Sequence, residues 1–277
     1  MKYKILENFI DKNFCNALIK DANLFSKNDY IKVLNNRLIL PSSSLAFLKL
    51  INNSKPWKEL HNQLNSQDFL KTILKALDLN EKNFEVTNFF FNHKPSTFLK
   101  KYKLLNSKKI STIGNLNLFF YAFYKIYRYL IRKFKFTFTS KNYVELLYDY
   151  SKSPNGYKRE IHRDSDSRTI VFLIYFNSIT QDGKGGNLEL YKYKKNERAI
   201  PSRPDTNDCK LIETILPEAG KLVTFLNSNT SLHAVSEMTN CSGYRHFLYG
   251  SFTLLGKKNN LIKSSVGSLK TNYNFFE

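Results

Sequence analysis

The stretch Glu160-Ile161-His162-Arg163-Asp164 places an imidazole and a carboxylate two residues apart. Side chains at that spacing lie on the same face of an extended strand, so both groups can reach one metal ion from one side. A second imidazole is available from His233, in the segment Ser231-Leu232-His233-Ala234-Val235. Two histidines and one carboxylate on one face would leave the opposite coordination positions open for other ligands.

Arg245, in Gly243-Tyr244-Arg245, follows His233 by twelve residues and is a fixed cation suited to two-pronged binding of a carboxylate. Two histidines and a carboxylate are the ligands of non-haem Fe(II) oxygenases. The order His-x-Asp, then His, then Arg resembles the 2-oxoglutarate and Fe(II)-dependent dioxygenase superfamily, and within it the prolyl 4-hydroxylase-like branch. The resemblance covers residues 143–256 and touches the N-terminus, where residues 5–10 precede an expected helix.

The resemblance implies a role for each of these residues. It makes His162, Asp164 and His233 the iron ligands at the catalytic centre, and Arg245 with Tyr175 the groups that bind 2-oxoglutarate. It further implies Fe(II), 2-oxoglutarate and L-ascorbate as cofactors. Dioxygen would be used to hydroxylate an acceptor, with release of succinate and carbon dioxide. The acceptor stays open: a peptidyl proline, a small molecule, or a glycan or lipid precursor.

Two other side chains compete for the ligand roles. Asp166 lies two residues beyond Asp164, and the spacing of the family favours Asp164 as the ligand. His246 competes with His233. Because neighbouring residues on a strand point to opposite faces, His246 should point away from the site if Arg245 points into it.

The chain also departs from the branch at two positions. The gap from His233 to Arg245 is about two residues longer than usual, and Phe247 stands where a small hydroxyl residue often follows the arginine. Both departures loosen the expected fit of the co-substrate. Gly185-Gly186 matches a glycine pair of the branch and indicates a tight turn without chemistry. Nucleic-acid demethylation would suit the net charge of +20, but Ser251 stands where oxygenases of that class carry a second arginine.

The fold expected from the strand pattern is a double-stranded β-helix (jelly roll), a mainly β core in an α+β chain. Strand after turn after strand at close spacing indicates an antiparallel sandwich or barrel. We expect a single oxygenase domain over residues 1–277. Its parts are the helical support with a first strand (1–93), a basic amphipathic insertion (94–141), the β core (142–256) and a tail (257–277).

The charged residues of the insertion are all basic. Residues 94–141 hold twelve lysines and arginines and no aspartate or glutamate. Within it, residues 116–135 carry aromatic and aliphatic side chains at helical spacing, with Lys125, Arg128 and Arg132 on another face. One interpretation is a helix that packs on the domain. The other is a contact with an anionic membrane or another polyanion.

The remaining features concern compartment and class. Three cysteines without paired spacing favour reduced thiols and a cytoplasmic protein, peripheral at the membrane surface if residues 116–135 bind lipid. We expect no signal peptide and no membrane span. His61 and His93 are interpreted as surface or packing residues. The alternative to an enzyme is a catalytically inactive oxygenase fold that serves as a basic binding module for a membrane surface or nucleic acid.

Overall fold

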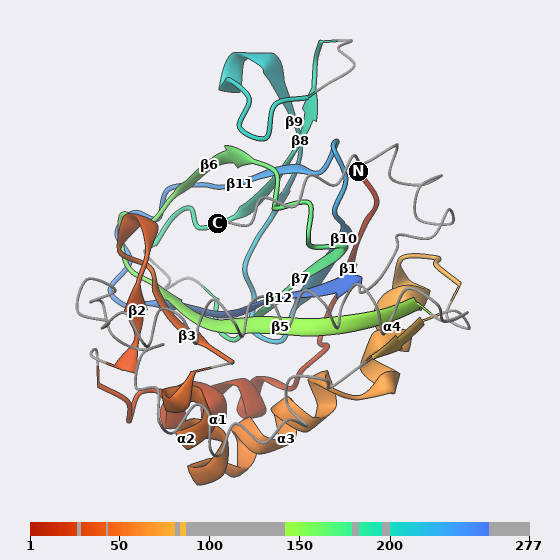
Figure 1. Cartoon of the computed structure of the whole chain (residues 1–277). Helices are drawn as coiled ribbons and strands as arrows, with labels where there is room; N and C mark the ends of the chain where they lie inside the picture. The colour runs from red at the N-terminus through yellow and green to blue at the C-terminus, as the bar shows by residue number, and fades with distance from the viewer. Residues whose placement is uncertain are drawn as a thin grey trace, which may run out of the picture.

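The computed structural model describes residues 1–26, 29–42, 44–80, 84–86, 142–178, 183–195 and 200–254. In these residues the strands form two facing sheets, the arrangement of a double-stranded β-helix (Figure 1). The larger sheet has the order β1 (Tyr3–Leu6), β10 (Leu222–Leu226), β7 (Ile170–Tyr175), β12 (Arg245–Leu254), β5 (Asn142–Ser153), β3 (Leu38–Pro41) and β2 (Ile31–Lys32), with β4 (Phe84–Val86) beside β5. The smaller sheet has the order β6 (Arg159–His162), β11 (Leu232–Val235), β8 (Leu188–Tyr193) and β9 (Cys209–Ile215).

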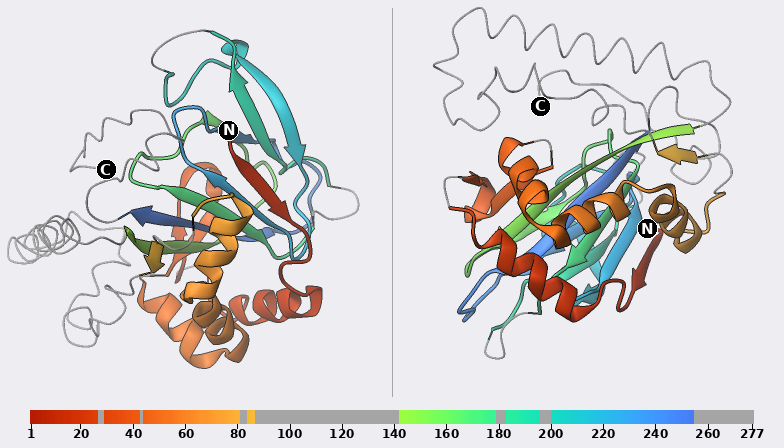
Figure 2. Two further views of the ribbon diagram at one scale, coloured as in Figure 1. Left: turned by 90° about the vertical axis from the view of Figure 1, so that its right-hand side faces the viewer. Right: turned by 90° about the horizontal axis from the view of Figure 1, so that it is seen from below.

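Among the described residues, four helices lie on the outer face of the larger sheet (Figure 2). They are α1 (Lys12–Ala22), α2 (Leu45–Asn53), α3 (Lys55–Leu64) and α4 (Gln67–Ala76), and two short 3-10 turns occur at Leu34–Asn36 and Thr206–Asp208. Each helix begins after a residue whose side chain accepts from a backbone N–H of its first turn: Asp11, Ser44, Ser54 and Ser66. Within the described part of the chain, no helix has the length and apolar character needed to cross a membrane.

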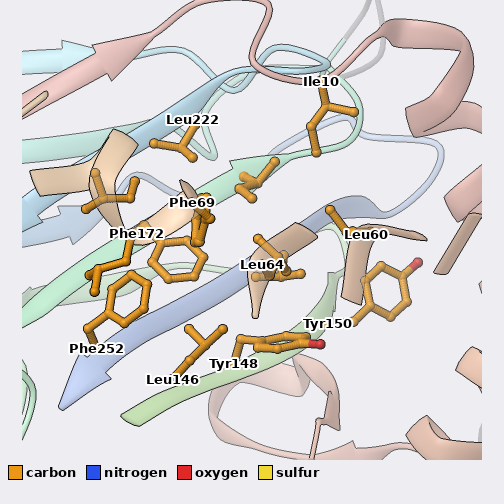
Figure 3. Packing of buried hydrophobic residues seen from close by; sticks show 14 of the residues in the cluster. Ile10, Leu60, Leu64, Phe69, Leu146, Tyr148, Tyr150, Phe172, Leu222 and Phe252 are labelled. Atoms are coloured by element: carbon orange, nitrogen blue, oxygen red, sulfur yellow. The ribbon is translucent and has the colours of Figure 1, made fainter. Parts of the chain in front are cut away.

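The main hydrophobic core lies between these helices and the larger sheet. Aromatic side chains from β5, β7 and β12 meet the helices there, including Tyr150, Phe172 and Phe252 (Figure 3). Trp57 of α3 is fully buried, and its indole nitrogen donates to the Leu18 carbonyl at 2.8 Å. Burial at about 25 cal/mol per Å² of apolar surface makes this layer the support that fixes the larger sheet.

A second core fills the space between the two sheets. It contains Tyr175 of β7, Phe225 of β10, and Phe247 and Tyr249 of β12 from the larger sheet, with Leu190 of β8 from the smaller one. Alternation along β12 therefore sends odd-numbered residues inward, while Leu248 joins the core under the helices. The inner face of the larger sheet becomes one wall of the site described below.

The structure agrees with the expected jelly roll. The last strand, β12, pairs with β5 from Arg245↔Ser153 to Leu254↔Val144. This long pairing carries β5 as far as Ser153. The free cysteines are Cys15, Cys209 and Cys241.

Several predictions fall wholly or partly outside the described residues. Of the first strand expected within residues 1–93, the structure describes β4 as far as Val86, and His93 lies outside the described residues. The basic segment 116–135 and the tail 257–277 also lie outside, so the domain boundaries stay predictions. His61 packs with Phe47, at 6.2 Å between ring centroids, in keeping with a packing role.

Candidate active site

Strand pairing brings the two candidate histidines together. His162 ends β6, and its Cα partner on the antiparallel strand β11 is His233. Residues paired in this way present their side chains to the same face of a sheet. The two imidazole rings lie 4.3 Å apart between centroids, and both side chains are buried.

Asp164 completes the group. It follows β6 by two residues, is 3 % exposed, and its Oδ2 atom lies 3.7 Å from Nε2 of His233. One ligand atom from each of His162, Asp164 and His233 can be chosen so that all lie within 4.8 Å of one another. This spacing fits three ligands around one ion.

The hydrogen bonds of the two histidines fix their tautomers. Nδ1 of His162 lies 2.8 Å from the Glu160 carbonyl, and Nδ1 of His233 lies 3.1 Å from the Ser231 carbonyl. A carbonyl oxygen only accepts, so each Nδ1 carries the proton and donates it. Nε2 of each neutral ring then holds a free lone pair, and Nε2 of His162 is buried without a hydrogen-bond partner. This is how metal-binding histidines are usually oriented.

Burial sets the protonation states of the three groups. Burial lowers the pKa of His162 to about 3, helped by the charges of His233 and Arg159. Burial also lowers the pKa of His233, against the opposing charge of Asp164. For Asp164, burial acts to raise the pKa, but His233 and Arg168 outweigh it and the pKa is lowered. At neutral pH the group therefore offers two neutral imidazoles and one carboxylate.

Arg168 is a part of the site that the sequence analysis missed. Its Nη1 atom donates to Oδ1 of Asp164 at 3.0 Å, which leaves Oδ2 buried and without a partner. Its guanidinium also lies 5.0 Å from the ring centroid of Tyr249. A single carboxylate oxygen is thus left for a metal ion. In the sequence, the arginine four residues after Asp164 could have indicated this contact.

The two rival side chains lie elsewhere. Asp166 pairs with Arg163 at 3.5 Å and is not part of the group of three. His246 points to the helix-covered side, where its Nδ1 atom lies 2.6 Å from the Tyr150 hydroxyl. Alternation along β12 thus separates it from Arg245, as expected.

Arg245 lies between the sheets and is almost completely buried, at 2 % exposure. Its guanidinium carbon lies 4.6 Å from the ring centroid of Phe247, 5.5 Å from Tyr157 and 5.8 Å from Tyr175. Its Nη1 atom donates to the carbonyl of Gly186, while its Nε atom has no partner. A buried cation with an unused donor is suited to an anionic ligand.

The structure explains why residue 185 must be glycine, and it shows a contact of Gly186 that the sequence did not indicate. Gly185 has a φ of +80°, and a Cβ atom there would lie 1.7 Å from the carbonyl oxygen of Glu237. Only glycine allows this close approach. The next carbonyl, that of Gly186, holds Arg245, so the turn also positions the candidate co-substrate group.

Three hydroxyl groups surround Arg245 without partners of their own. The Tyr175 hydroxyl is buried, and burial raises its pKa to about 12, so it stays protonated and can donate. On β5, Ser153 is the Cα partner of Arg245 and Ser151 that of Phe247. Both serine hydroxyls are also buried and unpartnered. In the branch, a small hydroxyl residue often stands at the position of Phe247. Here Ser151 and Ser153 supply hydroxyls from the neighbouring strand β5, which the sequence did not indicate.

Among the unpartnered buried atoms, two groups match two ligands. Buried polar atoms in folded proteins are nearly always hydrogen-bonded, so such clusters call for an explanation. Nε2 of His162 and Oδ2 of Asp164, beside His233, fit a divalent ion that takes nitrogen and oxygen ligands. Nε of Arg245 and the Tyr175 hydroxyl fit a carboxylate. Together they suit an iron ion and an oxoacid bound side by side.

Comparison with solved structures finds prolyl 4-hydroxylases. The enzyme from Pseudomonas putida is 14% identical, with a TM-score of 0.45 over 92% of this chain and 94% of that one. The enzyme from Phytophthora capsici is 12% identical, with a TM-score of 0.48 over 91% of this chain and 59% of that one. The collagen prolyl hydroxylase of Paramecium bursaria Chlorella virus-1, solved with 2-oxoglutarate, is 11% identical, with a TM-score of 0.42 over 93% and 97%.

Comparison with sequences gives one family. No curated protein matches the chain. Residues 147–252 match the 2OG-Fe(II) oxygenase superfamily, a span that begins in β5 and ends in β12. It includes every residue assigned above to the metal and oxoacid groups. With a His-Asp-His group in place inside this span, residues 147–252 resemble the 2OG-Fe(II) oxygenase superfamily.

Proposed function

We propose that this protein is a dioxygenase that hydroxylates an acceptor, using Fe(II), 2-oxoglutarate and dioxygen and releasing succinate and carbon dioxide. The observation that carries the proposal is the grouping of His162, Asp164 and His233, buried, with ligand atoms within 4.8 Å of one another. Their lone pairs are free at neutral pH, and two of these atoms have no partner among the described residues.

Each side chain has a defined task in this scheme. His162, Asp164 and His233 hold the iron, and Arg168 fixes the carboxylate so that one oxygen faces the metal. Arg245 and the Tyr175 hydroxyl bind the distal carboxylate of 2-oxoglutarate, which selects a dicarboxylic acid over a mono-acid. A charged hydrogen bond of this kind contributes about 1.5–3 kcal/mol.

The protein positions the reactants and excludes water. Phe225 packs on His233 at 5.0 Å between ring centroids, and Phe247 packs beside Arg245. These apolar rings lower the dielectric around the site, which strengthens its electrostatic contacts. Bound iron, with 2-oxoglutarate as the two-electron reductant, supplies the activation of dioxygen that no side chain can perform. L-ascorbate would serve as an accessory reductant.

The test is turnover of 2-oxoglutarate by purified protein with Fe(II) and ascorbate under air. We expect equimolar succinate and carbon dioxide, lost in His162→Ala and His233→Ala. The rival proposal, an inactive oxygenase fold acting as a basic binding module, predicts no succinate from the wild type. The intact set of unpartnered ligand atoms supports the enzyme, since loss of any one of them would have left a gap in the group.

The acceptor and the location of the protein are further proposals. A peptidyl proline, a small molecule and a glycan or lipid precursor remain the candidate acceptors. We propose a cytoplasmic protein whose basic segment 116–135 contacts anionic membrane, on the grounds of its charge. Salt-sensitive co-sedimentation with phosphatidylserine vesicles should be lost when Lys125, Arg128 and Arg132 are changed to Glu. Equal sedimentation of both proteins would reject this contact.

A further inference from the structure

The inner face of β5 carries a row of polar side chains that runs from Ser153, opposite Arg245, through Ser151 to Asp149. Asp149 and Ser151 point to the same side of the strand, two residues apart. The Cα partners of Asp149 are Tyr249 on β12 and Pro41 on β3, and those of Ser151 are Phe247 and Ile39. This row therefore lies on the wall that faces the smaller sheet.

Asp149 is close to the metal group through a short series of neighbours. Its strand partner Tyr249 lies under the guanidinium of Arg168, which in turn donates to Asp164. Arg168 is affected by the charges of both carboxylates. A molecule bound at Asp149 would thus lie beside the iron ligands.

The carboxylate of Asp149 has no partner of opposite charge among the described residues. It makes no hydrogen bond or ion pair with any other described residue, although it is only half-exposed. Burial raises the pKa of this carboxyl, and the charges of Arg37 and Arg168 oppose that effect. Neither arginine is close enough to form an ion pair with it. A partly desolvated carboxylate in this state favours a cationic ligand.

Arg37 supplies a positive charge at the other end of this row, the positive pole opposite the negative pole at Asp149. It precedes β3, and the alternation along that strand directs it to the same inner face as Ile39. Its guanidinium carbon lies 6.0 Å from the ring centroid of Phe247, the residue opposite Ser151. Within the described part of the chain it forms no ion pair. A half-buried guanidinium of this kind favours an anionic ligand.

Ser151 lies between the two poles. Its hydroxyl is completely buried and has no hydrogen-bond partner, a state that costs about 1–3 kcal/mol unless a ligand satisfies it. Alternate residues on a strand are about 6–7 Å apart. The row thus presents a carboxylate, a hydroxyl and a guanidinium in sequence over a distance that a small molecule can cover.

We propose that Asp149, Ser151 and Arg37 bind the acceptor as a zwitterion, with an ammonium group on Asp149 and a carboxylate on Arg37. The substrate class is then a free α-amino acid, whose side chain is presented to the iron. This inference rests on the proposed dioxygenase function for the reaction, but the binding it describes does not depend on turnover. The interior of a peptide has neither charge and would leave both poles unpaired.

Binding is tested first, without turnover. Saturation-transfer NMR would be recorded on the full chain with Zn(II), which is redox-inert, and 2-oxoglutarate, against the twenty common L-amino acids. We expect at least one free amino acid to bind, and its N-acetyl and methyl-ester derivatives to bind at least tenfold more weakly. Binding of blocked peptides but of no free amino acid would overturn the proposal, as would equal binding of free and blocked forms.

Variants assign the two poles. Asp149→Asn should reduce the preference for the free over the N-acetylated amino acid to near unity, and Arg37→Gln should do the same for the free acid over its ester. These ratios are measured within one variant, so a partly unfolded sample does not change them. Asp68→Asn on α4 and Lys58→Gln on α3, both exposed and on the helical layer, are the controls. Unchanged ratios in the Asp149 and Arg37 variants would reject the site.

Turnover separates this inference from the proposed function. If the wild type converts 2-oxoglutarate to succinate but no free amino acid binds or accelerates it, the zwitterion site is wrong and the dioxygenase function stands. If free amino acids bind with the predicted preferences but no succinate forms, the site stands and the dioxygenase function is wrong.

Discussion

Replacement of Arg245 by glutamine should weaken 2-oxoglutarate binding without removing the metal site. Arg245 is 2 % exposed, its Nε atom has no partner, and the unpartnered Tyr175 hydroxyl lies on the same inner face. Loss of one charged hydrogen bond costs about 1.5–3 kcal/mol. Since 1.4 kcal/mol corresponds to a factor of ten, the Kd for 2-oxoglutarate should rise by about 10–150-fold. The iron ligands are on β6, β11 and the segment after β6, so metal affinity should change little.

The assay is thermal unfolding with and without 2-oxoglutarate, in the presence of Zn(II). A ligand at one hundred times its Kd stabilises the folded state by about 2.7 kcal/mol, whereas at a concentration equal to Kd the gain is only about 0.4 kcal/mol. For a domain of this size, about 2.7 kcal/mol corresponds to a rise in Tm of roughly 5–10 °C. The variant should lose most of that rise at the same 2-oxoglutarate concentration.

The free protein gives an internal check. Without 2-oxoglutarate, Arg245 is a buried cation with no counter-ion among the described residues, so its removal should not destabilise the protein by the 3–5 kcal/mol typical of a broken buried ion pair. Arg203→Gln, which is exposed, is the control and should behave as the wild type. An undiminished rise in Tm with 2-oxoglutarate in the Arg245 variant would show that the co-substrate binds elsewhere.

Three further predictions concern neighbouring groups. Tyr175→Phe should raise the Kd for 2-oxoglutarate less than Arg245→Gln does, by about 2–10-fold for one neutral hydrogen bond, measured by the same thermal assay. Arg168→Gln should weaken metal binding by about 10–100-fold, because the carboxylate it holds at 3.0 Å becomes free to turn; competition with a chelator measures this. Burial lowers the pKa of His246 to about 4, below the ordinary 6.5, so the unfolded chain binds the extra proton and folding stability falls as pH drops from 6.5 towards 4. His246→Gln should remove up to about 3 kcal/mol of that pH dependence, measured by urea unfolding at each pH.

Helix starts and the metal group can be predicted from a sequence because both depend on local chemistry. Asp11 and Ser66 act as helix caps through hydrogen bonds to the next turn, which residue type alone indicates. His162 and Asp164 share a face because of strand periodicity. The order of motifs then added His233, although only the pairing of β6 with β11 shows that the two histidines are opposite each other.

What the sequence did not indicate depends on pairing between distant strands. Ser151 and Ser153 belong to the site because β5 pairs with β12, about a hundred residues later in the chain. The register places Ser151 opposite Phe247 and Ser153 opposite Arg245. Arg37 reaches the same face through β3, from the start of the chain. Register depends on packing of whole strands, which no short motif encodes.

The most direct test of the central claim is the iron content of the protein after anaerobic loading with Fe(II) and removal of excess metal. We predict one iron per chain in the wild type and in the control His246→Gln, whose side chain faces the helices. We predict essentially none in His162→Ala and in His233→Ala, with far-ultraviolet circular dichroism confirming that both remain folded. Full iron content in both alanine variants would contradict the assignment of these histidines as ligands.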